Sequence, residues 1–305
     1  MSEITAAKVK ELREKSGAGM MDAKKALQET NGDMEAAVDF LRKKGLAKAE
    51  KKSSRTAAEG LVVITSQGTT GAVVEVNSET DFVARNDKFQ SFVKQIAEKA
   101  MEVEDTDALM AADLGGKTVK DTLTDNIATI GENMSVRRME KLSVTDGAVV
   151  GYVHNPVAPN LGKIGVLVAL ESTGDKAALE ALGKQLAMHV AAAFPQCLNA
   201  DQADQDALER ERNIIRETAL AEGKPAEIVE KMLEGRMKKY LKEICLMDQI
   251  FVIDGETSIA DVVKNASNEV GAPVELKAYS RIQLGEGIEK EEEDFAAEVS
   301  KVANG

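Results

Sequence analysis

The sequence predicts an α+β protein in which helical segments precede, interrupt and follow a core of antiparallel strands. Three observations predict this class. The first 45 residues show helical periodicity, a strand–turn–strand–loop–helix pattern occurs twice in the centre, and residues 201 to 246 are dense in charge around an apolar seam. Apolar runs joined by turns are typical of antiparallel pairs, because a tight turn joins only antiparallel neighbours.

Composition favours a protein or small-molecule partner. The 305 residues, enough for one to three domains, carry a net charge of -13, so phosphate backbones and anionic lipid repel the chain. Aromatic residues make up only 3%, which argues against base-stacking platforms. The longest strongly apolar stretch, IGVLVAL, is too short to span a bilayer, and MSEITAAKVK has no signal-peptide pattern. We expect no direct nucleic-acid contact, no membrane contact and a cytoplasmic location. Cys197 and Cys245, which form no C-x-x-C, suit a reducing compartment.

Residues 1 to about 45 are predicted to form three short helices. Asp22 is expected to cap the second helix and Asp33 the third, because a carboxylate at that position accepts hydrogen bonds from free backbone N–H groups. Gly45 stands where a helix-ending glycine is common. The basic stretch RKKGLAKAEKKSSRTAA, residues 42 to 58, is then interpreted as a solvated linker, with a nucleic-acid arm as the less favoured alternative.

The centre of the chain contains an internal repeat. The first unit has GLVVITSQGTTGAVVEV followed by the helical DKFQSFVKQIAEKAM, and the second has GAVVGYVHNPVAPNLGKIGVLVAL followed by DKAALEALGKQLAMHVAAA. Sixteen residues separate Gly71 from Asp87, whereas ten separate Gly165 from Asp175. The additional residues fall in NSETDFVARND. Because the second unit connects strand to helix without them, the fold does not require this longer loop.

The longer loop places Phe82 beside Asp81, although loops of this kind are usually polar. If Phe82 is exposed, it can anchor a partner and contribute about 1.5–3 kcal/mol when fully buried on binding. The adjacent carboxylate can compete with ligands around a cation. Alternatively, Phe82 folds back beneath its own loop. The residues alone leave both possibilities open.

The later segments add helices to this core. DTLTDNIATIGENMSVRRMEKL predicts a helix that ends at Gly131 and then a strand. Residues 201 to 246 predict two antiparallel helices joined by EGKP, with Gly223 ending the first and Pro225 starting the second. A helix, SIADVVKNASNEV, and a strand, PVELKAYSRIQ, return to the core. The seam of the hairpin has coiled-coil spacing and consists of Leu233, Met237, Tyr240 and Ile244. The final stretch predicts an amphipathic helix with one apolar face, formed by Ile288, Phe295, Val299 and Val302.

The sequence contains no convincing catalytic or metal-binding motif. His154 and His189 lie in different elements: His189 is expected in or near the core, and His154 is either a contact residue or a solvated loop residue. LGGKTV lacks the first glycine of a phosphate-binding loop, because residue 111 is Ala. No Ser–His–Asp order or metal-ligand cluster occurs. We therefore expect a protein that is not an enzyme and that uses no cofactor and no bound metal.

Several motifs together resemble bacterial translation elongation factor Ts: VKELREKSGAGMMDAKKALQETNGDMEAA, EVNSETDFVARND, IGENMSVRR, AMHVAA, EGRMKKY and GEGIEKEEEDFAAEV. The resemblance runs in order along essentially the whole chain. It implies a guanine-nucleotide exchange factor for elongation factor Tu, a GTPase of protein synthesis. The alternative from another class is a non-exchanging binding module, such as a chaperone-like cofactor of a translation protein.

The resemblance also implies a domain organisation. It consists of a three-helix ubiquitin-associated-like (UBA-like) domain with the basic linker (1–54), a first core subdomain (55–143), a second core subdomain (144–197 and 247–285), a coiled-coil hairpin used in dimerisation (198–246) and a C-terminal helical module (286–305).

The same resemblance assigns site residues. Thr80, Asp81, Phe82 and Val83 match the signature that displaces Mg²⁺ from the GTPase and disturbs its phosphate-binding loop. Six further residues match positions that contact elongation factor Tu in the family: Arg13, Met20, Met21, Ile130, Gly131 and His154.

Overall fold

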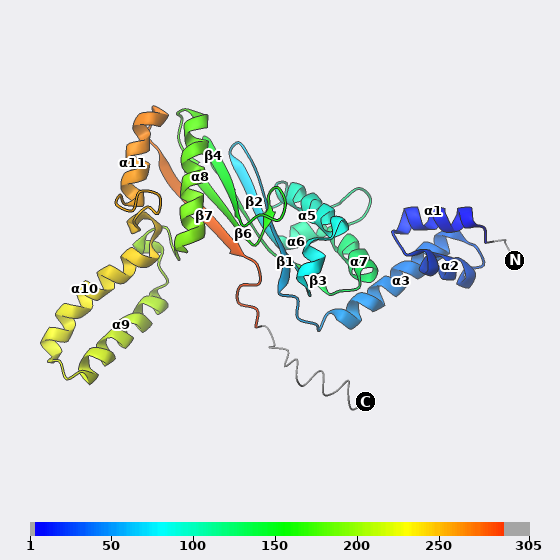
Figure 1. Cartoon of the computed structure of the whole chain (residues 1–305), viewed down its shortest axis with the longest axis horizontal. Helices are drawn as coiled ribbons and strands as arrows, with labels where there is room; N and C mark the ends of the chain where they lie inside the picture. Colours follow the sequence, from blue (N-terminus) through cyan, green and yellow to red (C-terminus); the bar gives the residue numbers. More distant parts are fainter. Residues whose placement is uncertain (1–3, 290–305) are drawn as a thin grey trace. The chain divides into compact units, whose positions relative to one another are not determined.

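The computed structural model describes residues 4–289, which belong to two compact units. The first unit comprises the chain up to residue 63, residues 74–139 and the segment from residue 283; the second comprises residues 64–73 and 140–282. Helices accompany two sheets, in which the strand orders are β3-β2-β1-β5 and β4-β6-β7 (Figure 1). The predicted α+β class is therefore confirmed.

Three helices open the first unit: α1 (Ala6–Ser16), α2 (Met20–Glu29) and α3 (Met34–Lys52). Their small core is built largely from leucine and alanine. Thr5 caps α1 by accepting a hydrogen bond from the backbone N–H of the third helical residue, and Asp33 caps α3 in the same way. The predicted role of Asp33 is confirmed.

The predicted end of the third helix at Gly45 is wrong, because α3 continues to Lys52. Gly45 is buried, and a Cβ atom there would lie 3.6 Å from Cβ of Ala128 on α7 (Val119–Ile130). Alanine and lysine are favourable in helices, and packing against α7 stabilises the extension. The basic stretch is therefore helical through Lys52 rather than a solvated linker.

The predicted cap at Asp22 is also wrong. Gly19 occupies the cap position of α2, and Asp22 lies in the first turn. Its carboxylate pairs with Lys44 Nζ at 2.6 Å and Lys48 Nζ at 3.2 Å. Lys44 and Lys48 lie one turn apart on α3, so the carboxylate of Asp22 links α2 to α3.

The chain from residue 59 to residue 143 contains the predicted strands and helices in order, together with two short helices, α4 and α6, that the sequence did not predict. They are β1 (Glu59–Gln67), β2 (Thr70–Ser78), α4 (Asp81–Ala84), α5 (Asp87–Ala100), α6 (Thr106–Ala111), α7 (Val119–Ile130) and β3 (Met134–Ser143). Helix α7 ends at Gly131, whose φ of 92° lies in the left-handed region that favours glycine. The predicted helix end at this glycine is confirmed.

The second unit contains the second copy of the repeat. Strand β4 (Gly147–His154) pairs antiparallel with β6 (Ile164–Glu171), from Gly147 opposite Glu171 to His154 opposite Ile164. The remaining elements around this pair are β5 (Leu161–Gly162), α8 (Lys176–Ala193), α11 (Ile259–Val270) and β7 (Glu275–Gln283).

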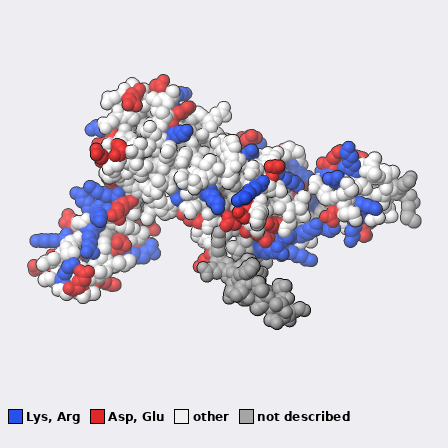
Figure 2. All heavy atoms as spheres, viewed as in Figure 1, with Lys and Arg blue, Asp and Glu red and all other residues white. Residues whose placement is uncertain are grey.

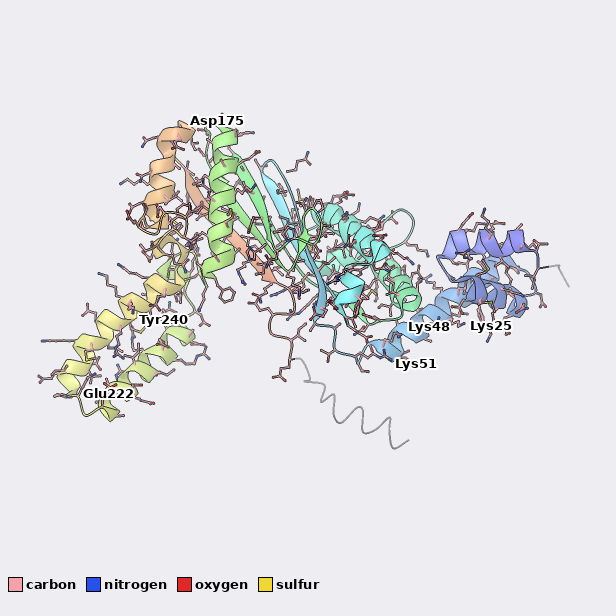
Figure 3. The ribbon with its side chains drawn as sticks, in the orientation of Figure 1. Lys25, Lys48, Lys51, Asp175, Glu222 and Tyr240 are labelled. Carbon is pink, nitrogen blue, oxygen red and sulfur yellow. The ribbon has the colours of Figure 1, made fainter. Side chains whose placement is uncertain are left out.

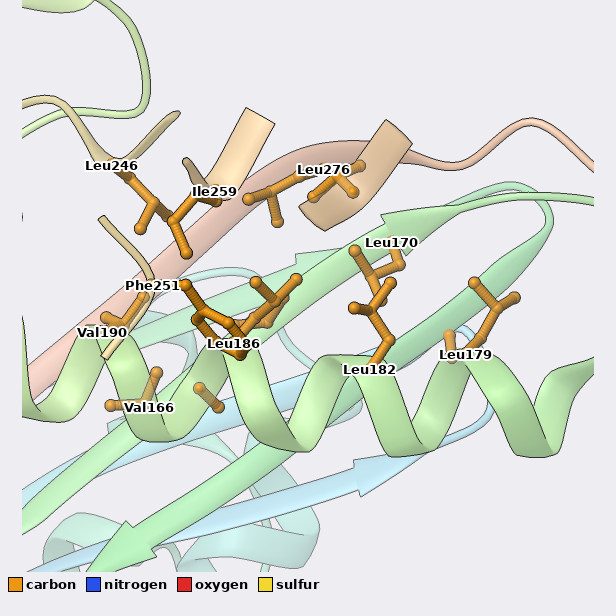
Figure 4. Close-up of a cluster of buried hydrophobic side chains, with 14 of the residues drawn as sticks. Val166, Leu170, Leu179, Leu182, Leu186, Val190, Leu246, Phe251, Ile259 and Leu276 are labelled. Atoms are coloured by element: carbon orange, nitrogen blue, oxygen red, sulfur yellow. The ribbon is translucent and has the colours of Figure 1, made fainter. Parts of the chain in front are cut away.

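The core of this unit lies between α8, the sheet and the segments that follow the hairpin (Figure 4). Its side chains are almost all aliphatic, as expected from a composition poor in aromatic residues. Those labelled in Figure 4 are Val166, Leu170, Leu179, Leu182, Leu186, Val190, Leu246, Phe251, Ile259 and Leu276.

A helical hairpin, α9 (Gln205–Ala221) and α10 (Ala226–Ile244), is inserted between two short 3-10 helices, η1 (Ala200–Gln202) and η2 (Leu246–Asp248). Side chains of both charge signs cover it (Figure 2). Glu222 lies at the turn and Tyr240 on α10 (Figure 3). Three predicted seam residues, Leu233, Met237 and Ile244, are buried.

Two further expectations concern membrane-spanning helices and the end of the chain. Within residues 4–289, no helix is long and apolar enough to cross a membrane. The predicted terminal amphipathic helix contains Phe295, Val299 and Val302, which lie outside the described residues.

Candidate partner-binding site

The longer loop of the first repeat contains a one-turn helix, α4, between the end of β2 at Ser78 and the start of α5 at Asp87. Its residues face two ways. Val83 and Ala84 are buried, with exposed fractions of 5% and 7%, whereas Phe82 is 76% exposed. Phe82 therefore does not fold beneath its own loop. The buried pair fixes the turn, and the aromatic ring projects into solvent.

The exit from this turn is fixed by polar contacts. Asn86 caps α5 because its Oδ1 accepts hydrogen bonds from the N–H groups of Lys88 at 3.0 Å and Phe89 at 3.2 Å. The side-chain amide of Gln90 donates to the carbonyl of Ala84 at 2.9 Å. These bonds allow α4 to be followed directly by α5.

The entry to the turn depends on a residue far away in the sequence. Thr80 occupies the cap position of α4, but its side chain makes no capping bond to that helix. Instead, its N–H and its hydroxyl both donate to the carboxylate of Glu132, at 3.0 Å and 2.7 Å. Glu132 directly follows Gly131, where α7 ends.

The neighbouring residues form a second link between the same segments. The carboxylate of Glu79 accepts a hydrogen bond from the N–H of Asn133, and Arg55 Nη1 lies 3.4 Å from its other oxygen. The side-chain amide of Asn133 donates to the carbonyl of Arg55 at 2.7 Å. Lys52, the last residue of α3, donates to the carbonyl of Gly131. Three separate stretches of chain thus meet beside α4.

Asp81 is available to a partner. Its side chain is 51% exposed, and its nearest ionic neighbour is Arg85, whose Nη2 lies 3.6 Å from Oδ2. An exposed pair of this kind contributes little to stability, so another cation or a partner can replace it at small cost. Among residues 4–289, no group of three or more His, Cys, Asp or Glu side chains could hold a metal ion.

A buried carboxylate lies on β2, the strand that leads into the site. Glu75 is fully buried and accepts hydrogen bonds from Arg138 Nε at 2.6 Å, the N–H of Gly285 at 2.7 Å and Asn77 Nδ2 at 3.0 Å. Burial raises the pKa of Glu75, but the bonds from Gly285, Asn77 and Arg138 outweigh this effect and hold the pKa below its ordinary value. Sequence analysis missed Glu75, because Arg138 and Gly285, which also bind it, are distant in the chain.

The helices at the N-terminus expose the residues assigned to them. Met20 and Met21, at the start of α2, are 60% and 76% exposed, and Arg13 on α1 is also exposed. Large apolar side chains that neither contribute to the three-helix core nor are covered by it are candidates for a contact surface.

The other assigned residues fall in two places. Ile130 and Gly131 end α7, and Glu132 connects them to Thr80, so the structure brings these positions together with the α4 turn. His154 belongs to the second unit, where it is exposed at the end of β4 and its Nδ1 lies 3.1 Å from the Tyr152 hydroxyl. His189, by contrast, is fully buried, as expected.

The fold presents exposed apolar and charged side chains on short elements of a packed scaffold, an arrangement typical of protein-binding factors. The sequence model of the family described as "Elongation factor TS" matches residues 79–286. Curated relatives named "Elongation factor Ts" match over the whole of both chains, with 62% identity in Erythrobacter litoralis, 61% in Rhizorhabdus wittichii and 58% in Rhizobium etli. The chain belongs to the elongation factor Ts family.

Proposed function

We infer that this chain is a guanine-nucleotide exchange factor for the GTPase elongation factor Tu. Membership of the elongation factor Ts family supports this role and disfavours a non-exchanging binding module. An exchange factor performs no bond chemistry of its own, in keeping with a chain that is not an enzyme and brings no cofactor. Elongation takes place in the cytoplasm, which is the proposed location.

We propose that the α4 turn, with Thr80, Asp81, Phe82 and Val83, carries the exchange activity. Phe82 inserts between elements of the GTPase, and the carboxylate of Asp81 disturbs the surroundings of its Mg²⁺. Loss of Mg²⁺ removes positive charge from the diphosphate, so GDP dissociates faster. By linkage, a factor that weakens GDP binding is itself weakened by GDP to the same extent. GTP then rebinds and displaces the factor.

The observation that carries this proposal is the division of α4 into a buried and an exposed side. Phe82 is 76% exposed although its neighbour Val83 is buried, so the ring contributes almost nothing to the fold of the free chain. Its burial free energy, about 1.5–3 kcal/mol, therefore remains available when a partner covers it. A rigid turn presents the ring without the entropy loss of ordering a flexible loop.

Stopped-flow release of a fluorescent GDP analogue from elongation factor Tu tests Phe82. We expect Phe82→Ala to melt within a few degrees of the parent and to lose about ten- to a hundredfold in the binding-linked rate. Ile253→Ala is the control, because Ile253 is an apolar residue that is 51% exposed and lies outside every proposed contact. Exchange by Phe82→Ala at the rate of the control would refute the role of this turn.

Mg²⁺ dependence tests Asp81 separately. We expect Asp81→Ala to accelerate GDP release less than the parent does when Mg²⁺ is plentiful, with the deficit shrinking as Mg²⁺ is removed. Glu98→Ala is the control, since Glu98 is an exposed carboxylate of α5. A deficit that is independent of Mg²⁺ would separate Asp81 from the Mg²⁺ step. Because both residues share one turn, the effects of Asp81→Ala and Phe82→Ala should not add.

We propose that the other assigned residues enlarge the contact with elongation factor Tu. Met20, Met21 and Arg13 supply exposed apolar and cationic groups for a grip by the N-terminal helices, which we regard as a UBA-like domain. Ile130 and Gly131 adjoin the α4 turn, and His154 adds a contact from the second unit. The hairpin of residues 198–246 is proposed as a coiled coil for homodimerisation. Residues 286–305 are proposed as a C-terminal module, of which residues 290–305 lie outside the described residues.

A further inference from the structure

The carboxylate of Glu132 is the only side-chain acceptor that the described residues place on both donor groups of Thr80. We propose that Glu132 is a positioning residue for exchange, which holds the Asp81–Phe82 turn in the orientation that enters the partner. The inference rests on the proposed function of α4. It assigns no contact with the partner to Glu132 itself.

The first argument concerns capping. A helix leaves its first N–H groups without partners, and a side chain at the cap position usually satisfies one of them. Thr80 holds that position in α4, yet its hydroxyl faces Glu132 and makes no capping bond. The start of α4 is therefore defined by a bond to the end of α7 and not by local capping. Val83, Ala84 and Asn86 hold the middle and the exit of the turn, whereas Glu132 supplies the side-chain contact that holds its entry at Thr80.

The second argument concerns bond strength. Hydrogen bonds to a charged acceptor are stronger than neutral ones, and two bonds from one residue to one carboxylate also define an orientation. The backbone bond, at 3.0 Å, restrains the chain, and the hydroxyl bond, at 2.7 Å, restrains the side chain of Thr80. Since Phe82 follows only two residues later, rotation at Thr80 would displace the ring directly.

The third argument is that Glu132 is itself held in place. It follows the left-handed Gly131, whose carbonyl accepts from Lys52. It precedes Asn133, whose N–H donates to Glu79 and whose side chain donates to Arg55. An acceptor fixed on both sides can orient the residue that binds it, whereas a mobile glutamate could not.

The orientation of the turn can be followed by fluorescence. Because the sequence contains no Trp, a tryptophan introduced at residue 82 would be the only one in the chain. In a Phe82→Trp chain, the fluorescence anisotropy of the single tryptophan measures the mobility of the turn without any partner present. We expect Glu132→Ala and Thr80→Val to lower the anisotropy. Thr80→Ser, which retains the hydroxyl, should restore it. Glu98→Ala, which removes an exposed carboxylate elsewhere on the first unit, should leave it unchanged.

The functional arm keeps Phe82 and measures release of labelled GDP from elongation factor Tu at saturating factor. We expect Glu132→Ala and Thr80→Val each to reduce the maximal rate by about tenfold, as for loss of a hydrogen bond to a charged group. The double variant should be no slower than Glu132→Ala, because Glu132→Ala already removes the hydroxyl bond that Thr80→Val removes. Melting temperatures establish that each variant is folded, and Thr80→Val, which replaces the hydroxyl by a methyl group of similar size, covers the case in which Glu132→Ala unfolds.

The two arms separate the outcomes. A slower rate with unchanged anisotropy would mean that Glu132 acts by touching the partner, which overturns positioning. Lower anisotropy with an unchanged rate would overturn the need for a fixed turn. If the parent itself did not accelerate GDP release, the proposed function would fail, while the anisotropy would still decide whether Glu132 holds the turn.

Discussion

The Sγ atoms of Cys197 and Cys245 lie 3.3 Å apart at the base of the α9–α10 hairpin. The chain enters and leaves the hairpin through this pair, with the N–H of Leu246 donating to the carbonyl of Cys197 at 2.8 Å. Both thiols are buried. Burial, together with the neighbouring Cys197 thiol, raises the pKa of Cys245 to about 12.

The first prediction is that these thiols react slowly. Thiolate is the reactive form, and the Cys245 thiol, with a pKa of about 12, is almost fully protonated near neutral pH. Burial shields both thiols from the reagent. We expect a chromogenic disulfide reagent at pH 8 to label the native chain far more slowly than the chain unfolded in guanidinium, which should release two equivalents. Labelling of the native chain at the rate of a free small-molecule thiol would show that the hairpin base opens readily.

The second prediction concerns the hairpin. Because its two ends already lie side by side, removal of residues 209–238 with a short Gly-Ser linker should leave the second unit folded. We expect exchange on elongation factor Tu to remain measurable and any dimer seen by sedimentation to disappear. Leu220→Ala, an exposed change within the hairpin, is the milder companion variant. A shortened chain that stayed dimeric but lost exchange would reverse the proposed roles.

The third prediction concerns Glu75. In Glu75→Gln, the fully buried residue no longer carries a charge, and its new amide N–H₂ must face Arg137 or Arg138, which are themselves donors. We expect a loss of about 2–3 kcal/mol in the free energy of unfolding. Because the folded pKa of Glu75 is lowered, its stabilisation is present above the unfolded pKa and is lost as pH falls through the folded pKa.

Chemical denaturation from pH 7 to pH 3 measures both parts of this prediction. Glu98→Gln provides the control, since Glu98 is exposed and should change neither stability nor its acid dependence appreciably. Equal stability of Glu75→Gln and the parent would mean that the buried ion pairs make no net contribution.

The fourth prediction concerns pH and His189. Its Nε2 lies 2.9 Å from Gln249 Oε1, and its Nδ1 accepts from the N–H of Val252 at 3.2 Å. This arrangement needs the neutral ring, and burial lowers the pKa of His189 below its ordinary value. A lowered folded pKa stabilises the fold above the unfolded pKa, and this stabilisation is lost as pH falls below it.

We therefore expect the free energy of unfolding to decline as pH falls from 7.5 to 5, and His189→Gln to flatten this part of the decline. His154→Gln is the control, because His154 is the other of the two histidines and is exposed. If His154→Gln rather than His189→Gln flattened the profile, the pH dependence would come from His154 and the prediction would be wrong.

The fifth prediction concerns Met20 and Met21. Since both side chains are largely exposed, Met20→Ala and Met21→Ala should leave the melting temperature unchanged. If the partner buries them, each should weaken binding to elongation factor Tu, by up to about 1.5–3 kcal/mol for full burial. Calorimetric titration measures this effect. Unchanged affinity in the double variant would remove these residues from the contact.

Much of the fold was accessible from local patterns. The repeat predicted where strands and helices alternate. Asp33 marked the start of a helix, and Gly131 and Gly223 marked the ends of two others, because capping depends only on residues that are close in the sequence. The errors at Gly45 and Asp22 have one cause. A tertiary contact overrode the local preference, since α3 packs on α7 and two of its lysines bind Asp22.

The candidate site was less accessible. The longer loop and its TDFV motif pointed to α4, but no pattern in the residues decided whether Phe82 was exposed. Glu132 and Glu75 were missed because Thr80 and Gly285, which bind them, lie tens to hundreds of residues away, and a single glutamate has no periodicity to mark it. Only the placement of β2, α7 and the chain after β7 brings these groups together.

Because α3 is one continuous helix, its exact number of residues determines both how far Met20 and Met21 lie from the end of α3 and in which direction around the helix axis they point. A helix advances about 1.5 Å and turns about 100° per residue, so one residue removed between Gly45 and Lys52 would swing Met20 and Met21 around the axis. A flexible tether would absorb the same deletion without effect. A change of one residue in this short stretch is therefore expected to alter the direction in which Met20 and Met21 point, although both side chains are still present.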